Sequence, residues 1–239
     1  MKGLRTLTGM ALRELWISFR LIPVIGLPLV AGMAVIALPP ELAGVSAIGG
    51  AGLWYAAGAG ASICLAAALA ASTIADERRR GTLAWMAVRA VPRSAVLVSW
   101  FVAYGLLLGG GIALGSVGAY LAGLARAESP IDPLPYLAAV VAVVCTALAA
   151  LAAALLIGTL LGRWPAAIGV LVAFGALLAA TIGGSPGGTL LPSAGVGLLA
   201  DLDGAARPVA DALRAGGTAL AIGAGLLVLA AAVLERADL

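Results

Sequence analysis

The sequence contains long runs without a single charged residue, and these runs limit the chain to helices that lie in a membrane. The runs cover residues 21–40, 42–75, 94–125, 133–162, 164–200 and 215–234. Each run reaches the roughly 20 residues that a helix needs to cross a bilayer. Hydrophobic residues make up 63% of the chain and its mean hydropathy is +1.13, far above the usual values for soluble domains. These features predict an all-α integral membrane protein with six transmembrane helices.

The predicted elements form a single transmembrane domain over residues 1–239. We expect the transmembrane helices at 21–39, 46–75, 96–125, 134–162, 164–183 and 215–234. Pro186 and four glycines between Gly183 and Gly188 end the fifth helix, because neither residue type continues a helix without cost. The segment 189–213 is therefore predicted to hold short re-entrant or amphipathic helices on the outer side, too short to cross the bilayer.

Residues 1–20 are predicted to form an amphipathic helix along the inner membrane surface. At about 100° per residue, the basic side chains share one face and the apolar side chains point elsewhere. Such a helix places its charges at the lipid headgroups. The membrane-interface residues are Lys2, Arg5, Arg13, Glu14, Trp16 and Arg20. The alternative is a positively charged flank that only sets the topology of the first transmembrane helix.

The basic residues indicate the orientation, because they accumulate in the cytoplasmic loops of membrane proteins. With both termini in the cytoplasm, all basic residues except Arg126, Arg207 and Arg214 lie on the inner side. The net charge of +3 is thus the sum of a basic inner face and a more acidic outer face, and it indicates no affinity for nucleic acid. We predict a multi-pass protein of a bacterial or archaeal cell (inner) membrane, surrounded by membrane lipid.

Residues needed for catalysis or for autonomous energy coupling are missing from the sequence. The chain has no histidine, its only lysine is Lys2, and it lacks a Gly-x-x-x-x-Gly-Lys-Ser/Thr phosphate-binding loop. Cys64 and Cys145 lie within predicted helices, where single thiols usually act as small packing residues. No predicted transmembrane helix contains an ionisable side chain of the kind that relays protons in coupled transporters. We therefore predict no catalytic, metal-binding or cofactor-binding residue in this chain.

Small residues recur at helical spacing in the third predicted transmembrane helix. Gly105 and Gly109 form one pair four residues apart, and Gly111 and Gly115 form another. This spacing lets the backbones of two helices approach closely. Ordinary packing within the chain and a subunit interface both fit the pattern.

The densest group of charges lies in the hairpin between the second and third predicted transmembrane helices. Residues 76–83 read Asp-Glu-Arg-Arg-Arg-Gly-Thr-Leu, and a short apolar stretch leads from there to Pro92 and Arg93. In order and spacing, this hairpin resembles that of the permease subunits of type-2 (ABC-2) ATP-binding-cassette exporters. The matching residues are Glu77, Gly81, Thr82, Leu83, Pro92 and Arg93. Residues 11–20 and 234–239 resemble the N-terminal interfacial helix and the C-terminal ending of that family.

The resemblance implies that residues 76–93 form a cytoplasmic coupling helix that docks on a separate ABC ATPase subunit. The implied docking residues are Asp76, Glu77, Arg78, Arg79, Arg80, Gly81, Thr82, Leu83, Trp85, Met86, Pro92 and Arg93. Arginines of this kind can pair with acidic groups, and the apolar side chains can anchor in a pocket. The family also implies two ATPase copies, which bind ATP and Mg, and a second permease copy or a homologous permease. The alternative is a solvated basic loop that binds nothing.

The function expected from these features is that of a permease subunit of an ATP-driven exporter, which is not itself an enzyme. The nearly charge-free interior indicates a hydrophobic or amphipathic substrate, moved out of the cytoplasm or the inner leaflet. One alternative is a cargo-specific permease similar to the heme- or polymer-export branches. Another is a non-transporting sensor or assembly factor that partners a cassette ATPase, and a third is an autonomous channel or secondary carrier.

Overall fold

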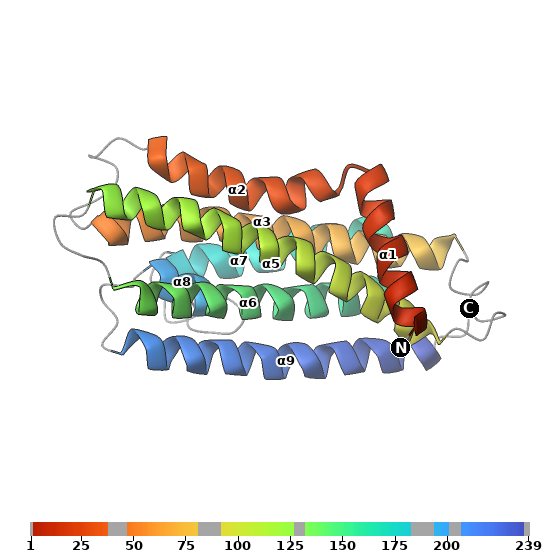
Figure 1. Ribbon diagram of the computed structural model, residues 1–239. Coiled ribbons are helices and arrows are strands. Elements are labelled where there is room, and N and C mark those ends of the chain that lie inside the picture. Colours follow the sequence, from red (N-terminus) through yellow and green to blue (C-terminus); the bar gives the residue numbers. More distant parts are fainter. Residues whose placement is uncertain are drawn as a thin grey trace.

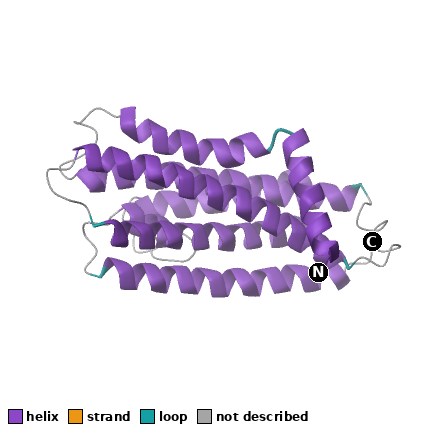
Figure 2. Cartoon of the chain, viewed as in Figure 1, coloured by secondary structure: helices purple, strands orange, loops and turns teal. Residues whose placement is uncertain are grey.

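The computed structural model describes residues 2–37, 47–80, 92–126, 132–182, 194–200 and 207–236, and every element in these ranges is a helix (Figure 2). The helices are α1 (Lys2–Ile17), α2 (Leu21–Ala37), α3 (Ala47–Arg79), α5 (Arg93–Arg126), α6 (Pro133–Leu160), α7 (Arg163–Ile182), α8 (Ala194–Ala200) and α9 (Pro208–Arg236). The all-α prediction is thereby confirmed for the described part of the chain.

Five of the described helices are long and apolar enough to cross a membrane, namely α3, α5, α6, α7 and α9. Helices α1 and α2 pass the same test only as a pair, which is bent by 75° at the break between them and raises the number of spans to six. By length and composition the chain is therefore a multi-pass membrane protein, and the predicted six helices agree with the upper of these two numbers.

The long helices lie side by side and alternate in direction, so that each end of the bundle gathers its own set of chain segments (Figure 1). Helix α1 crosses one end, where α3 and α9 finish and where α5 and α7 start. We call this end the basic end, because it carries Arg20, Arg79, Arg93, Arg163 and Arg236. The segregation of these arginines onto one end matches the pattern that the positive-inside rule requires.

Helices α3 and α6 form the centre of the bundle, and α7 and α9 pack around them (Figure 1). Most of α6 is buried, including the apolar residues from Ala147 to Leu155 except partly exposed Leu148 and Ala153. The outer helices expose large apolar side chains such as Ile168, Val172 and Val228. Apolar side chains on the outer surface of a bundle are stable where lipid replaces water.

Helices α2 and α5 pack so closely that glycines are required at their crossing. A Cβ atom at Gly32 would lie 2.1 Å from the carbonyl oxygen of Gly115, and one at Gly115 would lie 2.3 Å from the carbonyl oxygen of Pro28. On the other side of α5, Gly105 and Gly109 face side chains of α6. Both predicted glycine pairs therefore pack against helices of the same chain.

Two buried tyrosines add hydrogen bonds to the same stretch of α5. The hydroxyl of Tyr55 donates to the carbonyl oxygen of Ile112, and the hydroxyl of Tyr136 donates to that of Ser116 at 2.8 Å. These bonds tie α3 and α6 to α5 in a medium that offers no water as a substitute partner.

The contribution of the hydrogen bond between Tyr136 and Ser116 to stability can be tested by substitution. Tyr136→Phe is expected to lower the free energy of unfolding by about 1 kcal/mol, because only the hydroxyl and its hydrogen bond are lost. This corresponds to a fall of about 2–4 °C in the thermal midpoint of the detergent-solubilised protein. Tyr136→Leu also removes the ring that packs against the tilted ring of Tyr120 at a centroid distance of 5.1 Å, and should cause a larger fall. An unchanged midpoint for Tyr136→Phe would show that the bond adds no stability.

Two predicted helix boundaries differ from those in the structure by four residues or more. Helix α3 does not end at residue 75 but continues to Arg79, so the first charges of the predicted hairpin lie on the helix. Helix α9 starts at Pro208, a residue suited to a first helical turn, and not at residue 215, so it includes the end of the segment 189–213 that was predicted to hold short outer helices. The other short element is α8, which packs against α3 and α6 and buries Val196 and Leu199.

Candidate functional site

The last turns of α3 bring polar and charged side chains into the basic end of the bundle. Thr73 and Asp76 lie three residues apart, on one face of the helix. Asp76 and Glu77 are each only 8% exposed. The continued helix, not a loop, thus presents both carboxylates to neighbouring helices, and burial of such groups requires partners.

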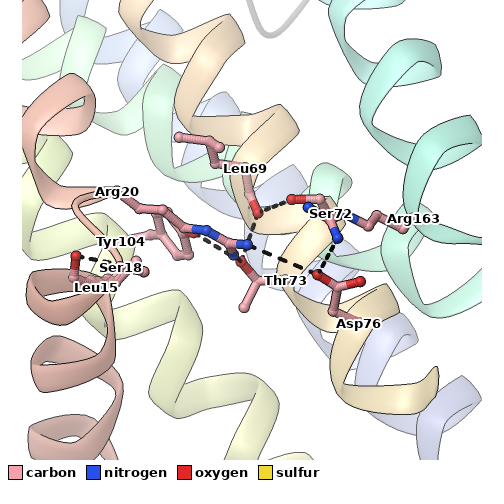
Figure 3. A network of polar contacts seen from close by, with 9 residues as sticks. All are labelled: Leu15, Ser18, Arg20, Leu69, Ser72, Thr73, Asp76, Tyr104 and Arg163. Atoms are coloured by element: carbon pink, nitrogen blue, oxygen red, sulfur yellow. Dashed lines mark hydrogen bonds and ion pairs between the residues drawn. The ribbon is translucent and has the colours of Figure 1, made fainter. Parts of the chain in front are cut away.

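One partner of Asp76 comes from the turn between α1 and α2. Phe19 in this turn has a φ of 56°, a left-handed conformation that is uncommon for a bulky residue. The turn allows the 75° bend and directs Arg20 back toward α3 (Figure 3). There the Nη1 atom of Arg20 donates to Thr73 Oγ1 at 2.7 Å, and its Nη2 atom lies 3.9 Å from Asp76 Oδ2.

Thr73 connects Arg20 to two further helices. Its hydroxyl donates to the carbonyl oxygen of Leu69 at 2.8 Å, which leaves its lone pairs free to accept. The hydroxyl of Tyr104 on α5 lies 3.0 Å from the same oxygen, so Tyr104 is the donor in that bond. A single threonine therefore joins the α1–α2 turn, α3 and α5.

A second arginine approaches Asp76 from the opposite side (Figure 3). Arg163, the first residue of α7, places Nη1 at 3.5 Å from Asp76 Oδ2. Its guanidinium group also lies over the ring of Trp164, with the Cζ atom 5.3 Å from the ring centroid. The Oδ2 atom of Asp76 accepts no hydrogen bond from the described residues, so its contacts with Arg20 and Arg163 are ion pairs only. We call Arg20, Thr73, Asp76, Tyr104 and Arg163 the Asp76 cluster.

Arg78 links the end of α3 to the end of α6. Its Nη1 atom donates to the carbonyl oxygen of Thr159, within the last turn of α6. Carbonyl groups in that turn have no partner within their own helix, so an arginine is well suited to them. Together with the Asp76 cluster, this contact connects α3 to the α1–α2 turn, α5, α6 and α7.

A hollow of about 330 Å³ lies beside these contacts, between the ends of α3 and α6 and the start of α7. Its lining residues are Ala75, Arg78, Arg79, Leu160, Leu161, Gly162 and Arg163. Three arginines therefore line one open hollow at the basic end.

The structure separates the predicted docking residues into two groups. Asp76 and Glu77 are buried and Arg78 is partly buried, so these side chains face the bundle. Arg79, Arg80 and Pro92 are exposed, whereas Arg93 is partly buried. The remaining predicted docking residues lie outside the described residues, namely Gly81, Thr82, Leu83, Trp85 and Met86.

A helix forms where the interfacial helix is predicted, namely α1, which packs on α5 and buries Ala11 and Leu15. Its residues Arg5, Arg13, Glu14 and Trp16 are exposed, whereas the side chain of Lys2 lies outside the described part. Arg20 departs from the prediction. The residue follows the end of α1, and its side chain turns inward to Asp76 instead of outward to lipid headgroups.

Sequence reasoning missed four residues at this site: Thr73, Tyr104, Thr159 and Arg163. Arg163 carried a usable signal, because it is the only charge between two long apolar runs and such a charge at a membrane boundary requires a partner. Thr73 and Thr159 carried no such signal, since threonine hydroxyls often bond to the backbone of their own helix. Tyr104 carried none either, because the spacing of residues does not show which helix its hydroxyl faces.

The chemistry of these residues is that of a structural and electrostatic connection. Within the described ranges, no group of three His, Cys, Asp or Glu residues could hold a metal ion. Arginines and carboxylates at these distances can bind each other, or release each other and bind an external charged group. A conformational change at the end of α3 would therefore alter contacts with several helices at once.

Comparison with known proteins does not identify a family. No family model matches the chain, and no curated protein matches its sequence. The contacts at the basic end are therefore the main basis for a functional assignment.

Proposed function

We propose that the chain is the permease subunit of an ATP-driven exporter of the ABC-2 type, and that a separate ATPase docks on residues 76–93 at the cytoplasmic side. In this proposal the partner ATPase binds ATP and Mg, and the assembly contains two ATPase copies with two permeases. The substrate is hydrophobic or amphipathic and leaves the cytoplasm or the inner leaflet.

The observation that carries the proposal is the way in which the base of the hairpin is built into the bundle. Helix α3 continues without a break to Arg79, so a force applied to the hairpin reaches a rigid helix. Asp76 then contacts Arg20 and Arg163, and Arg78 contacts the carbonyl oxygen of Thr159. Movement of this helix end would therefore be passed to the α1–α2 turn, α6 and α7, as a coupling element requires.

The length of the helices supports a hairpin that extends out of the membrane. Helix α3 has 33 residues and α5 has 34. At 1.5 Å per residue each is about 50 Å long, whereas the hydrocarbon core is about 30 Å thick. The concentration of arginines at the basic end supports a cytoplasmic location for this end.

The interior of the bundle supports an apolar or amphipathic substrate. A cavity of about 200 Å³ lies between α6, α7 and α9, and its lining includes Phe174, Leu177 and Ile222. Apolar linings favour apolar ligand groups. The second candidate function, a non-transporting partner of a cassette ATPase, needs the same hairpin but makes no use of this cavity.

A test of the hairpin uses Leu83→Asp, which places a charge in the proposed apolar anchor. We expect the cassette ATPase that copurifies with the full chain to bind this variant about tenfold less tightly, because the variant removes the apolar side chain that the proposed anchor uses and introduces an unpaired charge. Binding is measured by titration of the purified ATPase onto the chain in nanodiscs. Arg236→Gln is the matched control, because it removes an exposed charge from the basic end outside the hairpin.

Reconstitution separates the candidate functions. If the chain is an exporter subunit, the purified chain and ATPase together move a lipophilic dye across the vesicle membrane only when ATP is present. ATP hydrolysis without dye movement would favour the non-transporting partner. Dye movement by the chain alone, without any ATPase, would contradict both and favour an autonomous carrier.

A further inference from the structure

The hollow at the basic end is lined by three arginines, and no carboxylate is among its described lining residues. Arg163 shares Asp76 with Arg20, and Arg78 contacts a neutral carbonyl group. The Arg79 side chain is exposed and makes no hydrogen bond or ion pair with the described residues. Guanidinium groups that converge without an equal number of carboxylates attract an external anion.

The surface around the hollow is apolar. Leu160 and Leu161, which line it, are 59% and 44% exposed, and Trp164 and Ile168 on α7 are 68% and 56% exposed. Tryptophan prefers the level of the lipid headgroups, and exposed aliphatic side chains prefer the acyl chains next to them. Trp164 directly follows Arg163, so a residue type that prefers the headgroup level adjoins the arginines of the hollow.

We propose that this hollow binds the headgroup of an anionic phospholipid. Arg79, Arg163 and Arg78 surround the phosphate, since guanidinium groups bind phosphate oxygens in pairs of hydrogen bonds. The acyl chains lie along Leu161, Trp164 and Ile168. Basic pockets between transmembrane helices on the cytoplasmic side are suited to anionic lipid headgroups.

The apolar rim is what favours a lipid over other anions. A free phosphate ion would need the arginines but gain nothing from four exposed apolar side chains. An acidic segment of a partner protein would approach from the water and not from the lipid side of α7. A phospholipid can contact the arginines and the apolar rim at the same time, because its charged phosphate and its acyl chains are joined in one molecule.

The test measures lipid preference of the full chain in phosphatidylcholine nanodiscs, without any partner protein. Spin-labelled phosphatidylglycerol and spin-labelled phosphatidylcholine are compared by the immobilised fraction of their spectra. We expect the wild-type chain to prefer phosphatidylglycerol, and Arg79→Gln to reduce this preference about fivefold, as for one arginine near an anionic lipid. Arg79 is the chosen position because its side chain supports no described contact within the fold.

Matched variants distinguish this site from general attraction to a basic surface. Arg80→Gln removes the adjacent exposed charge, which does not line the hollow, and should leave the preference unchanged. Arg79→Lys should retain most of it. Equal losses in Arg79→Gln and Arg80→Gln, or no preference for phosphatidylglycerol in the wild type, would overturn the proposal.

Competition identifies the source of the anion. Unlabelled phosphatidylglycerol should displace the labelled lipid, whereas millimolar inorganic phosphate or a glutamate-rich peptide should not. Displacement by inorganic phosphate at fixed ionic strength would overturn the lipid assignment in favour of a free anion. Stronger displacement by the peptide than by unlabelled lipid would overturn it in favour of an acidic protein partner.

Discussion

Gly115→Ala is expected to lower the thermal midpoint of the detergent-solubilised protein by about 2–12 °C, because the added methyl group has no space between α5 and α2. A Cβ atom at this position would lie 2.3 Å from the carbonyl oxygen of Pro28 and 2.8 Å from its carbonyl carbon. Both atoms belong to backbone, so no side-chain rotation can relieve the clash. The two helices must separate, and overpacking of this kind costs about 1–3 kcal/mol.

The same crossing offers a reciprocal variant and a control. Gly32→Ala should have a similar effect, since its Cβ would lie 2.1 Å from the carbonyl oxygen of Gly115. Gly110→Ala is the control on α5, because a Cβ atom there meets nothing within 4 Å. A fall in the midpoint as large for Gly110→Ala as for Gly115→Ala would contradict the assigned contact and point to a general effect on the helix.

Asp76→Asn is expected to lower the free energy of unfolding by about 2 kcal/mol, or about 4–8 °C in thermal midpoint. The substitution keeps the size of the side chain but removes the charge that both Arg20 and Arg163 contact. Breaking a buried ion pair costs more than this. The two arginine side chains are, however, 25% and 42% exposed, so solvent compensates part of the loss.

A double-mutant cycle isolates the ion pair between Asp76 and Arg163. Arg163→Gln alone and Asp76→Asn alone should each destabilise, and the double variant should be less destabilised than the sum of the two. Glu235→Gln is the control, because it removes an exposed carboxylate at the basic end. Strict additivity of the two substitutions would show that the 3.5 Å contact contributes no interaction energy.

The helices of this protein could be predicted closely because each depends on its own residues. The charge-free run from residue 133 to residue 162 predicted a helix at 134–162, and α6 spans Pro133–Leu160. The end of α3 was harder to predict. The prediction ends the second transmembrane helix at residue 75 and assigns Asp76 and Glu77 to the cytoplasmic hairpin. The helix instead continues to Arg79, where other chain segments supply counter-charges to Asp76.

The candidate site could be predicted only in part. The charged hairpin correctly identified the end of the bundle at which the site lies. The prediction, however, assigned Arg20 to the membrane surface and gave Arg163 no role in the site. Both arginines converge on Asp76, although they are far from each other in the chain. Their convergence requires the turn at Phe19 and the position of α7 beside α3, and neither follows from spacing in the sequence.

The order of residues alone is enough to establish that this chain forms apolar helices of membrane-spanning length and gathers most of its arginines at one end. These properties are local, because a helix in lipid satisfies its backbone hydrogen bonds internally and needs only a sufficient run of apolar residues. The contacts between helices, in contrast, become visible only in the folded bundle, where Arg20 and Arg163 share Asp76, and Gly32 and Gly115 meet backbone to backbone. Those contacts depend on how each helix is rotated and placed against its neighbours, which packing of the whole bundle determines.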